Sequence, residues 1–437
     1  MQRANCSADA RFEIVKQNNK YMKKAFFFFA ILMPIVCSAQ FDKYFENAAL
    51  RMDYSHSGRV GIEYFTLERF LKIPEWAGSK VNLIDTLSLG VHKVEMREKA
   101  TGKLLFSKGY CSLMEEWLTM PEAKNSCGNF QEVMLFPFPK VDVEFWFFTR
   151  DEKNEYKLIS KIDFDKSVLE EAKKEEFAKT ITIHKAGKSN KCLDIAIVPA
   201  GYTEQEKEKM YKDLEMYAGY FFSKPPFSEA KDKINIIGIE RFDTESGLPG
   251  LKTSTATSNG IGVHYNTFGS ERYVMTEQLW ALHDALLGAS YDQIVILCNS
   301  EVYGGGGIYN FYATTYRNPQ NSFVLIHEFG HSFAGLADEY SSNDSDAGLV
   351  SVETEPWERN ITSLKNFKGK WEDMIDKSTP VPTPCTKEYE KVGVFEGAAY
   401  QQKGMYRPYQ DCLMRSDKPF CPVCSREIER MIEYHCR

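Results

Sequence analysis

NSFVLIHEFGHSFAGLADEY, residues 321–340, contains two histidines four positions apart, His327 and His331. An α-helix turns about 100° per residue, so both imidazoles lie on one helix face and can bind a single metal ion. Zinc in proteins binds such imidazole nitrogens at roughly 2.0–2.1 Å. Glu328 follows the first histidine and can take a proton from the attacking water, then return one to the leaving amine. The segment therefore predicts a helix with two zinc ligands and a general base.

The residues after this helix offer the third protein ligand that a catalytic zinc site needs. Gly335 can take a positive φ, end the helix and turn the chain back under the metal. Asp338, three residues later, is then well placed to be the ligand, and Glu339 competes with it. The metzincin signature HExxHxxGxxH uses a glycine turn and a ligand in the same way, although here the glycine comes one residue later and the ligand is aspartate. Alone, Asp338 and Glu339 would be ordinary acidic loop residues, but beside this motif we expect Asp338 to bind the metal.

Three downstream residues are candidates for supporting roles. Metzincins carry a methionine turn beneath the zinc, after the third ligand, and Met414 in CLMRS comes in that order. A single methionine more commonly fills a core. A tyrosine hydroxyl can also stabilise the transition state, and both Tyr340 and Tyr406 are candidates.

The composition is that of an ordinary folded protein. Its 437 residues suffice for two or three domains, and 43% are apolar and 26% charged. The 54 basic and 61 acidic residues give a net charge of −7, without a long basic run, which argues against nucleic acid as a partner.

Residues 1–39 are interpreted as upstream residues followed by a signal peptide. From Met22 the chain reads MKKAFFFFAILMPIVCSAQ, with two lysines, an apolar run over 25–36 and small residues up to a cleavage site after Ala39. The run is too short for a comfortable membrane span. Cys37 raises the alternative of a lipid anchor, although the residues before it match a lipidation motif poorly. We expect export through the Sec pathway to the periplasm, cell surface or extracellular space, without a stable membrane span in the mature chain.

Residues 40–165 are predicted to form a separate β-sandwich accessory domain. Strand-like runs alternate there with turn-forming residues, which is typical of an antiparallel sandwich. His56 and His92 lie in this region without a metal-binding pattern, so we interpret it as a packed accessory domain. The runs are VGIEYFTL (60–67), LGVHKVEMRE (89–98), KLLFSKGY (103–110), EVMLFPFP (132–139) and DVEFWFFTR (142–150).

Residues 166–437 are predicted to form the catalytic domain. A charged segment, 167–181, is interpreted as a helix that leads into it, and strands and helices then alternate. This order predicts a mainly parallel sheet flanked by helices. The expected strands are 193–201, 233–240 and 292–298, and the expected helices are 203–223 and 272–288.

Two further segments surround the metal-binding helix. Residues 304–316 are predicted to be an edge strand, to which an extended substrate can add by strand pairing. Residues 341–384 are interpreted as a polar connection with helical pieces around Trp357 and Trp371. The predicted fold class is therefore α+β multidomain, with an N-terminal antiparallel β-sandwich followed by an α/β zincin-like metallopeptidase domain.

Nine cysteines would remain after signal cleavage. Cys421 and Cys424 form a CxxC pair flanked by Cys412 and Cys436, which is compatible with a structural zinc site. Disulfides are more common in exported proteins, so we favour them here. The odd count leaves at least one thiol free within the chain, and Cys298, in an apolar strand, is the candidate.

Motifs throughout the chain accompany the metal-binding helix. They are LRMDYSHSG (50–58), EEW (115–117), IVPAGYT (197–203), YGGGG (303–307), HEFGHSFAGLADEY (327–340), FEGAAY (395–400), YRP (406–408), CLMRS (412–416) and FCPVC (420–424). With them, about 400 residues of the chain resemble the bacterial IgA-peptidase family of zinc metallopeptidases.

The resemblance implies a zinc-dependent endopeptidase with its own N-terminal β-sandwich domain. It implies His327 and His331 as ligands and Glu328 as the catalytic residue, and the aspartate of the family's DEY motif aligns with Asp338. It does not imply that immunoglobulin is the substrate, because proteins that share a fold can act on different substrates.

We therefore expect an exported endopeptidase that holds one catalytic Zn²⁺ and acts on a protein or peptide. One alternative is a surface or glycan-binding protein with a structural zinc, favoured by the aromatic-rich N-terminal region. Another is a hydrolase of peptidoglycan peptides.

Overall fold

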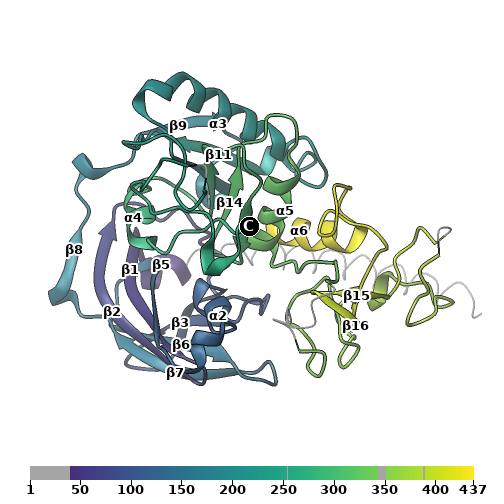
Figure 1. Ribbon diagram of the computed structural model, residues 1–437. Coiled ribbons are helices and arrows are strands. Elements are labelled where there is room, and N and C mark those ends of the chain that lie inside the picture. Colours follow the sequence, from purple (N-terminus) through teal and green to yellow (C-terminus); the bar gives the residue numbers. More distant parts are fainter. Residues whose placement is uncertain (1–39, 253, 343–350, 387–388) are drawn as a thin grey trace, which may run out of the picture.

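The computed structural model describes residues 40–252, 254–342, 351–386 and 389–437. The predicted signal peptide lies outside these residues. Figure 1 shows a strand-rich N-terminal region beside a second, mixed sheet, with helices α5 and α6 near the centre of the molecule. Among the described helices, none combines the length and apolar character needed to cross a membrane.

The N-terminal region consists of two four-stranded sheets. The first has the order β5-β1-β2-β8 and the second β4-β3-β6-β7, and all pairs are antiparallel except β2 with β8. A short helix, α2 (Leu113–Trp117), follows β4. The strands are β1 (Phe45–Arg59), β2 (Ile62–Ile73), β3 (His92–Glu98), β4 (Leu104–Tyr110), β5 (Gly128–Pro139), β6 (Val143–Arg150), β7 (Tyr156–Asp163) and β8 (Leu169–Glu171).

These two sheets pack face to face through aromatic side chains. Successive residues of β6 alternate between buried and half-buried, as expected for a strand with one face against a core. Phe136 of the first sheet lies 4.5 Å from Phe145 of the second, between ring centroids, and Tyr54 lies 5.2 Å from Phe147. The region is therefore a β-sandwich, as predicted.

The second region is built on a six-stranded sheet of order β13-β14-β12-β10-β11-β9. The four central strands run parallel and the two edge strands antiparallel to their neighbours. Helices α3 (Lys207–Phe221) and α5 (Phe323–Ala334) contact the sheet and each other, so they cover the same face. The strands are β9 (Thr180–His184), β10 (Leu193–Ala200), β11 (Ile234–Ile239), β12 (Gln293–Cys298), β13 (Gly305–Ile308) and β14 (Tyr312–Tyr316). The predicted fold class is confirmed.

Two predicted helices are wrong in whole or in part. Segment 167–181 holds β8, a 3-10 turn at Lys174–Glu176 and the start of β9 instead of an α-helix, because Leu169–Glu171 pairs with β2. Tertiary pairing here overrides the helix propensity of a Glu-, Ala- and Lys-rich segment. Of the predicted helix 272–288, only α4 (Leu279–Asp284) forms, since Tyr273 and Met275 make isolated β-bridges.

The predicted edge strand 304–316 is a hairpin of β13 and β14. Its glycines let helix α5 approach: a Cβ on Gly307 would lie 2.1 Å from the Glu328 carbonyl oxygen. The outer edge of β13 is already hydrogen-bonded at Gly305, whose backbone donates to Arg272 O and accepts from Val274 N–H. The edge available to a substrate is therefore shorter than the sequence predicted.

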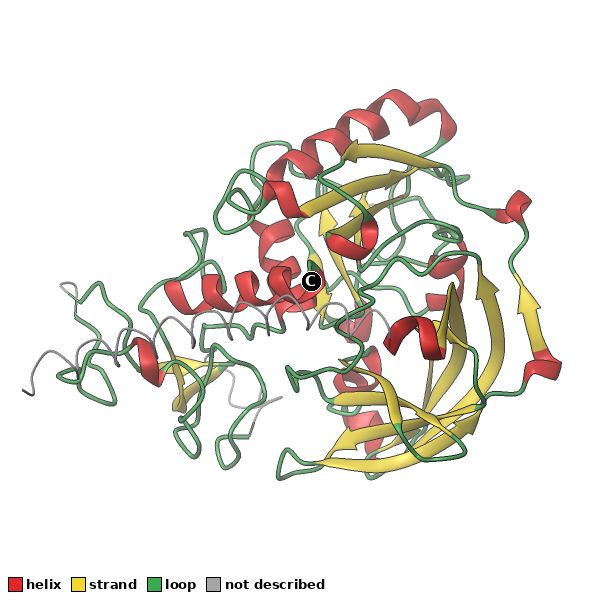
Figure 2. Ribbon diagram, turned by 180° about the vertical axis from the view of Figure 1, so that it is seen from behind, coloured by secondary structure: helices red, strands yellow, loops and turns green. Residues whose placement is uncertain are grey.

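The C-terminal part carries a small hairpin and a helix. Strands β15 (Phe395–Ala398) and β16 (Gln401–Arg407) form a two-stranded sheet that lies apart from the larger sheets in Figure 2. Helix α6 (Pro422–His435) packs against α5. Near Trp371 a 3-10 turn covers Glu372–Met374, whereas the helical piece expected around Trp357 does not form. Trp357 instead packs on Gly335 and on the Tyr309 ring.

Candidate active site

Helix α5 ends where the glycine spacing predicted. Gly335 has φ of 59°, in the left-handed region. Its N–H donates to His331 O, and Leu336 N–H donates to Gly330 O at 3.3 Å, which satisfies the last carbonyls of the helix. A Cβ at this glycine would also lie 2.7 Å from the Trp357 ring. The chain therefore turns back beneath α5 at this point.

The turn brings three side chains together. His327 Nε2 lies 3.2 Å from His331 Nε2, and Asp338 Oδ1 lies 3.1 and 3.4 Å from these two nitrogens. Two ligands of a tetrahedral zinc, each at roughly 2.0–2.1 Å, are about 3.3–3.4 Å apart. The spacing of the three atoms therefore fits zinc ligands.

Hydrogen bonds fix the orientation of both imidazoles. Nδ1 of His327 donates to Leu413 O at 2.9 Å, and Nδ1 of His331 donates to Leu336 O at 2.5 Å. Since a carbonyl only accepts, the neutral rings carry their proton on Nδ1 and direct the Nε2 lone pairs at each other. Asp338 Oδ1 is buried and has no hydrogen-bond partner among the described residues. Three electron-rich atoms facing one another without a donor fit a bound cation.

The protonation of these groups follows from burial and mutual charge. Burial opposes ionisation of Asp338, but His331 and His327 outweigh it and hold its pKa far below the usual range. Burial likewise opposes charge on His331, yet Asp338 raises the pKa of that ring to about 9, so a metal ion displaces this proton when it binds the neutral ring. Burial raises the pKa of Glu328, the residue between the histidines. A carboxylate with a raised pKa is better matched to proton transfer near neutral pH.

Glu339, the competing ligand, points away from the histidines. Its Oε1 accepts hydrogen bonds from Asn360 Nδ2 and Cys424 Sγ, both at 3.0 Å. Its backbone N–H donates to Met414 O at 2.8 Å. The structure thus brings Asp338, and not Glu339, to the histidine pair.

Met414 lies directly under α5. A Cβ on Gly330 would be 2.8 Å from Met414 Sδ, so this methionine packs directly against the glycine of the helix. The carbonyl of the preceding residue, Leu413, holds His327. This position beneath the histidine pair corresponds to that expected for a methionine turn.

The tyrosines near Asp338 differ from those expected. Tyr400 was not among the predicted site residues, yet its hydroxyl donates to Asp338 Oδ2 at 2.5 Å. Tyr340 OH lies 3.2 Å from Tyr400 OH and faces the same cavity. Tyr406 instead lies on β16, pairs with Glu396 across the hairpin and does not line the cavity. Sequence spacing gave no signal for Tyr400, because β15 and β16 fold back onto the ligand loop.

A cavity of about 990 Å³ opens over these residues. Its walls come from both regions of the chain, and the N-terminal region contributes Glu116 and Arg150 among others. Tyr273 donates a hydrogen bond to Glu116, and burial raises the pKa of Glu116 to about 7. The sequence did not predict this contribution, because α2 reaches the cavity only through tertiary packing.

Comparison with known families identifies the chain. The family described as IgA Peptidase M64 matches residues 181–391 and 385–432, and the Peptidase M64 N-terminus matches residues 40–160. The chain therefore belongs to the IgA peptidase M64 family, and this membership makes it a peptidase that acts on proteins or peptides. A comparison with curated proteins finds no match.

Proposed function

We propose that this peptidase is an exported zinc-dependent endopeptidase. In this proposal His327, His331 and Asp338 hold one catalytic Zn²⁺, and Glu328 is the general base. The observation that carries it is the convergence of two imidazole Nε2 atoms and one buried, unpartnered carboxylate oxygen within 3.4 Å. Family membership supports the choice of peptide-bond hydrolysis over a binding function.

Bound zinc would supply Lewis acidity to the attacking water and to the scissile carbonyl. Glu328 would accept the proton of that water on its carboxylate and deliver a proton to the leaving amine. Leu413 O and Leu336 O hold the two imidazoles in the tautomer that a ligand needs. Tyr340, with its hydroxyl in the cavity, is the better of the two predicted transition-state stabilisers.

The cavity supports an extended peptide as substrate. Gly305–Ile308 of β13 forms one wall, and the part of this strand beyond Gly305 offers backbone pairing, which recognises a peptide independently of its side chains. A volume of about 990 Å³ exceeds what a single residue needs, which favours cleavage within a chain.

Export belongs to the same proposal and rests on the signal-like segment that ends at Ala39. N-terminal sequencing of the protein recovered from cell fractions tests it. Export predicts a chain that begins at Gln40 outside the cytoplasm. An uncleaved chain in the cytoplasm would contradict it.

The catalytic proposal is tested by zinc content and casein hydrolysis of the wild type and of Glu328→Gln. We expect both proteins to hold catalytic zinc and the variant to lose about 10²–10⁴-fold in activity, the usual contribution of a general base. Peptidoglycan is assayed in parallel to separate the two substrate classes. Near wild-type turnover in Glu328→Gln would remove this residue from the mechanism.

A further inference from the structure

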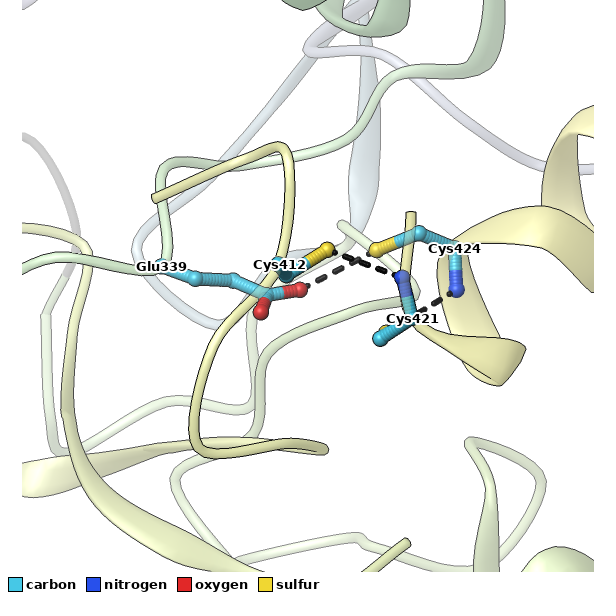
Figure 3. A group of neighbouring side chains, drawn as sticks. All are labelled: Glu339, Cys412, Cys421 and Cys424. Atoms are coloured by element: carbon cyan, nitrogen blue, oxygen red, sulfur yellow. Dashed lines mark hydrogen bonds between the residues drawn. The ribbon is translucent and has the colours of Figure 1, made fainter. Parts of the chain in front are cut away.

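A second group of metal-ligand side chains lies behind the active site. Glu339, Cys412, Cys421 and Cys424 each offer one ligand atom, and these four atoms all lie within 4.8 Å of one another. Figure 3 shows the carboxylate of Glu339 facing the sulfurs of Cys412 and Cys424. Ligands of a tetrahedral zinc with Zn–S of roughly 2.3 Å are about 3.8 Å apart. The group is therefore slightly wider than a closed zinc site, and both thiolates and carboxylates are zinc ligands.

The four side chains are removed from solvent and come from three separate segments. Their exposed fractions are 0% for Glu339, Cys412 and Cys424 and 3% for Cys421. Glu339 follows the turn after α5, Cys412 precedes Met414, and Cys421 and Cys424 open helix α6. A helix N-terminus stabilises thiolates, and Cys421 is the N-cap residue of α6.

Backbone amides already point at the sulfurs. Cys421 N–H donates to Cys412 Sγ at 3.2 Å, and Cys424 N–H donates to Cys421 Sγ at 3.4 Å. Such outer-shell hydrogen bonds orient the ligands of a metal and are part of its site. The sulfurs are therefore held in place by the fold before any ion is considered.

An unpartnered oxygen marks this group as incomplete. Glu339 Oε2 is buried and has no hydrogen-bond partner among the described residues. Arg407 carries the nearby positive charge, but its Nη1 is bonded to the carbonyls of Glu396 and Gly397. A buried carboxylate is costly unless it is paired, hydrogen-bonded or bound to a metal. Beside three thiols, a metal is the partner that completes it.

A disulfide explains the group less well. The sequence favoured disulfides here, but all nine cysteines of the described chain are unpaired in the structure. Any one bond among Cys412, Cys421 and Cys424 would leave the third thiol beside an uncompensated Glu339. Cys436, the fourth member expected from sequence, lies elsewhere, with its Sγ 3.5 Å from Lys233 O.

We propose that Glu339, Cys412, Cys421 and Cys424 bind a second, structural Zn²⁺. Three thiolates and a carboxylate provide four protein ligands, so the site is closed to substrate and holds no exchangeable water. The soft sulfur ligands select zinc over magnesium or calcium. Zinc binding displaces the thiol protons, so the site is filled more readily as the pH rises.

The second zinc would fix the loops that build the active site. Glu339 is adjacent to Asp338, and Cys412 is adjacent to Leu413, whose carbonyl holds His327. One ion would thus tie the third ligand, the Met414 loop and α6 together. The site itself stands independently of the proposed function, whereas this positioning effect rests on it.

The test is zinc content together with the absorption spectrum of the cobalt-substituted full chain. Cobalt bound by thiolates gives an intense charge-transfer band that imidazole and carboxylate ligands do not give. We expect about two zinc ions per wild-type chain and about one in His331→Ala, which keeps the thiolate–cobalt band. Cys424→Ser should lose one zinc and most of that band. Cys298→Ser, a buried cysteine of β12 outside the group, should keep both zinc ions and the band.

The outcomes separate this proposal from the catalytic one. If Cys424→Ser does not fold, the zinc count and the cobalt band of His331→Ala decide the question. No zinc in that variant, or cobalt without a thiolate band, overturns the proposal. So does an intact mass lower by two hydrogens, with Cys412, Cys421 or Cys424 in a disulfide. One thiolate-bound zinc in the wild type, unchanged in His331→Ala, would support this site and contradict the catalytic one.

Discussion

The chain contains two histidine pairs of nearly equal ring geometry. His327 and His331 have ring centroids 4.8 Å apart at an interplanar angle of 84°, and His56 and His92 in the sandwich are 5.0 Å apart at 82°. Both pairs have a carboxylate among their neighbours. The two differ in what their ring nitrogens bind, and this difference separates a metal centre from an ion network.

In the sandwich pair, side chains occupy all four ring nitrogens. His56 bonds Glu132 and Glu63 at 2.8 and 2.9 Å, and His92 bonds Thr149 and Glu115 at 3.0 Å each. Burial opposes charge on His56, but Glu132 and Glu63 outweigh it and raise its pKa to about 9. A proton on His56 therefore balances the carboxylates. The sequence had indicated no cluster here, and the structure shows one in which every ring nitrogen is bonded to a side chain.

In the pair on α5, only the Nδ1 atoms are bonded to carbonyls, and the Nε2 atoms converge on Asp338. The comparison teaches that the number and spacing of histidines do not define a metal site. In the pair on α5, a carbonyl accepts the Nδ1 proton of each ring, and Nε2 is thereby left free to bind an ion.

The largest effect is expected from matched carboxylate changes at the two pairs. Asp338→Asn removes the anionic ligand, so we expect the catalytic zinc to be lost and the activity to fall below about one hundredth of wild type. This loss exceeds the roughly 10–100-fold loss that follows removal of an outer-shell partner of a ligand. Glu63→Gln, beside His56, should keep zinc content and activity. Assays of both variants for zinc and casein hydrolysis check this, and equal losses in the two would remove the distinction between the pairs.

His56→Ala should act on stability alone. It leaves Glu132 buried without its partner, and breaking a buried pair in this way costs about 3–5 kcal/mol. Urea unfolding measures the loss, and zinc content should stay at the wild-type value. His184→Ala serves as the control, because the wild-type His184 ring is bonded to a backbone carbonyl near the surface. A fall in zinc content in His56→Ala would place a metal in the sandwich.

Alkaline pH should weaken the sandwich through the same residue. Because the folded pKa of His56 is raised from 6.5 to about 9, its contribution is complete below pH 6.5 and is lost as the pH rises through 9. The loss is on the order of 3 kcal/mol for this buried group. Unfolding free energies of wild type and His56→Gln across this range check it, and the two curves should converge above pH 9. Parallel curves would contradict a charged His56.

The smallest effect is expected from Tyr400→Phe. Its hydroxyl bonds Asp338 Oδ2, and loss of such an outer-shell partner typically costs about 10–100-fold in metal affinity or activity. Zinc titration of the metal-depleted protein measures it. Tyr406→Phe, outside the cavity, should change affinity by about twofold or less. Equal behaviour of the two variants would show that Tyr400 does not support the ligand.

Local sequence patterns predicted the parts of the site that lie close together along the chain. The four-residue spacing of the histidines, Gly335 as the helix end and the position of Asp338 all depend on helix geometry and one turn. Strand alternation likewise predicted the sandwich. The alternation of strands with helices predicted the mainly parallel sheet.

Contacts between distant segments were outside the reach of these patterns. Tyr400 reaches the cavity from the turn before β16, and Glu116 reaches it from α2. Both residues are far from α5 in sequence. Segment 167–181 was mistaken for a helix because its pairing with β2 is a tertiary effect. The cysteines were recognised as a group, but their partner Glu339 was assigned to compete for the catalytic metal.

Anomalous diffraction at the zinc edge, from crystals of the full chain, tests the central claim most directly. Our account predicts an anomalous peak within coordination distance of His327 Nε2, His331 Nε2 and Asp338 Oδ1, and none beside His56 and His92. A peak beside His56 and His92, or none at the pair on α5 in zinc-replete protein, would contradict it.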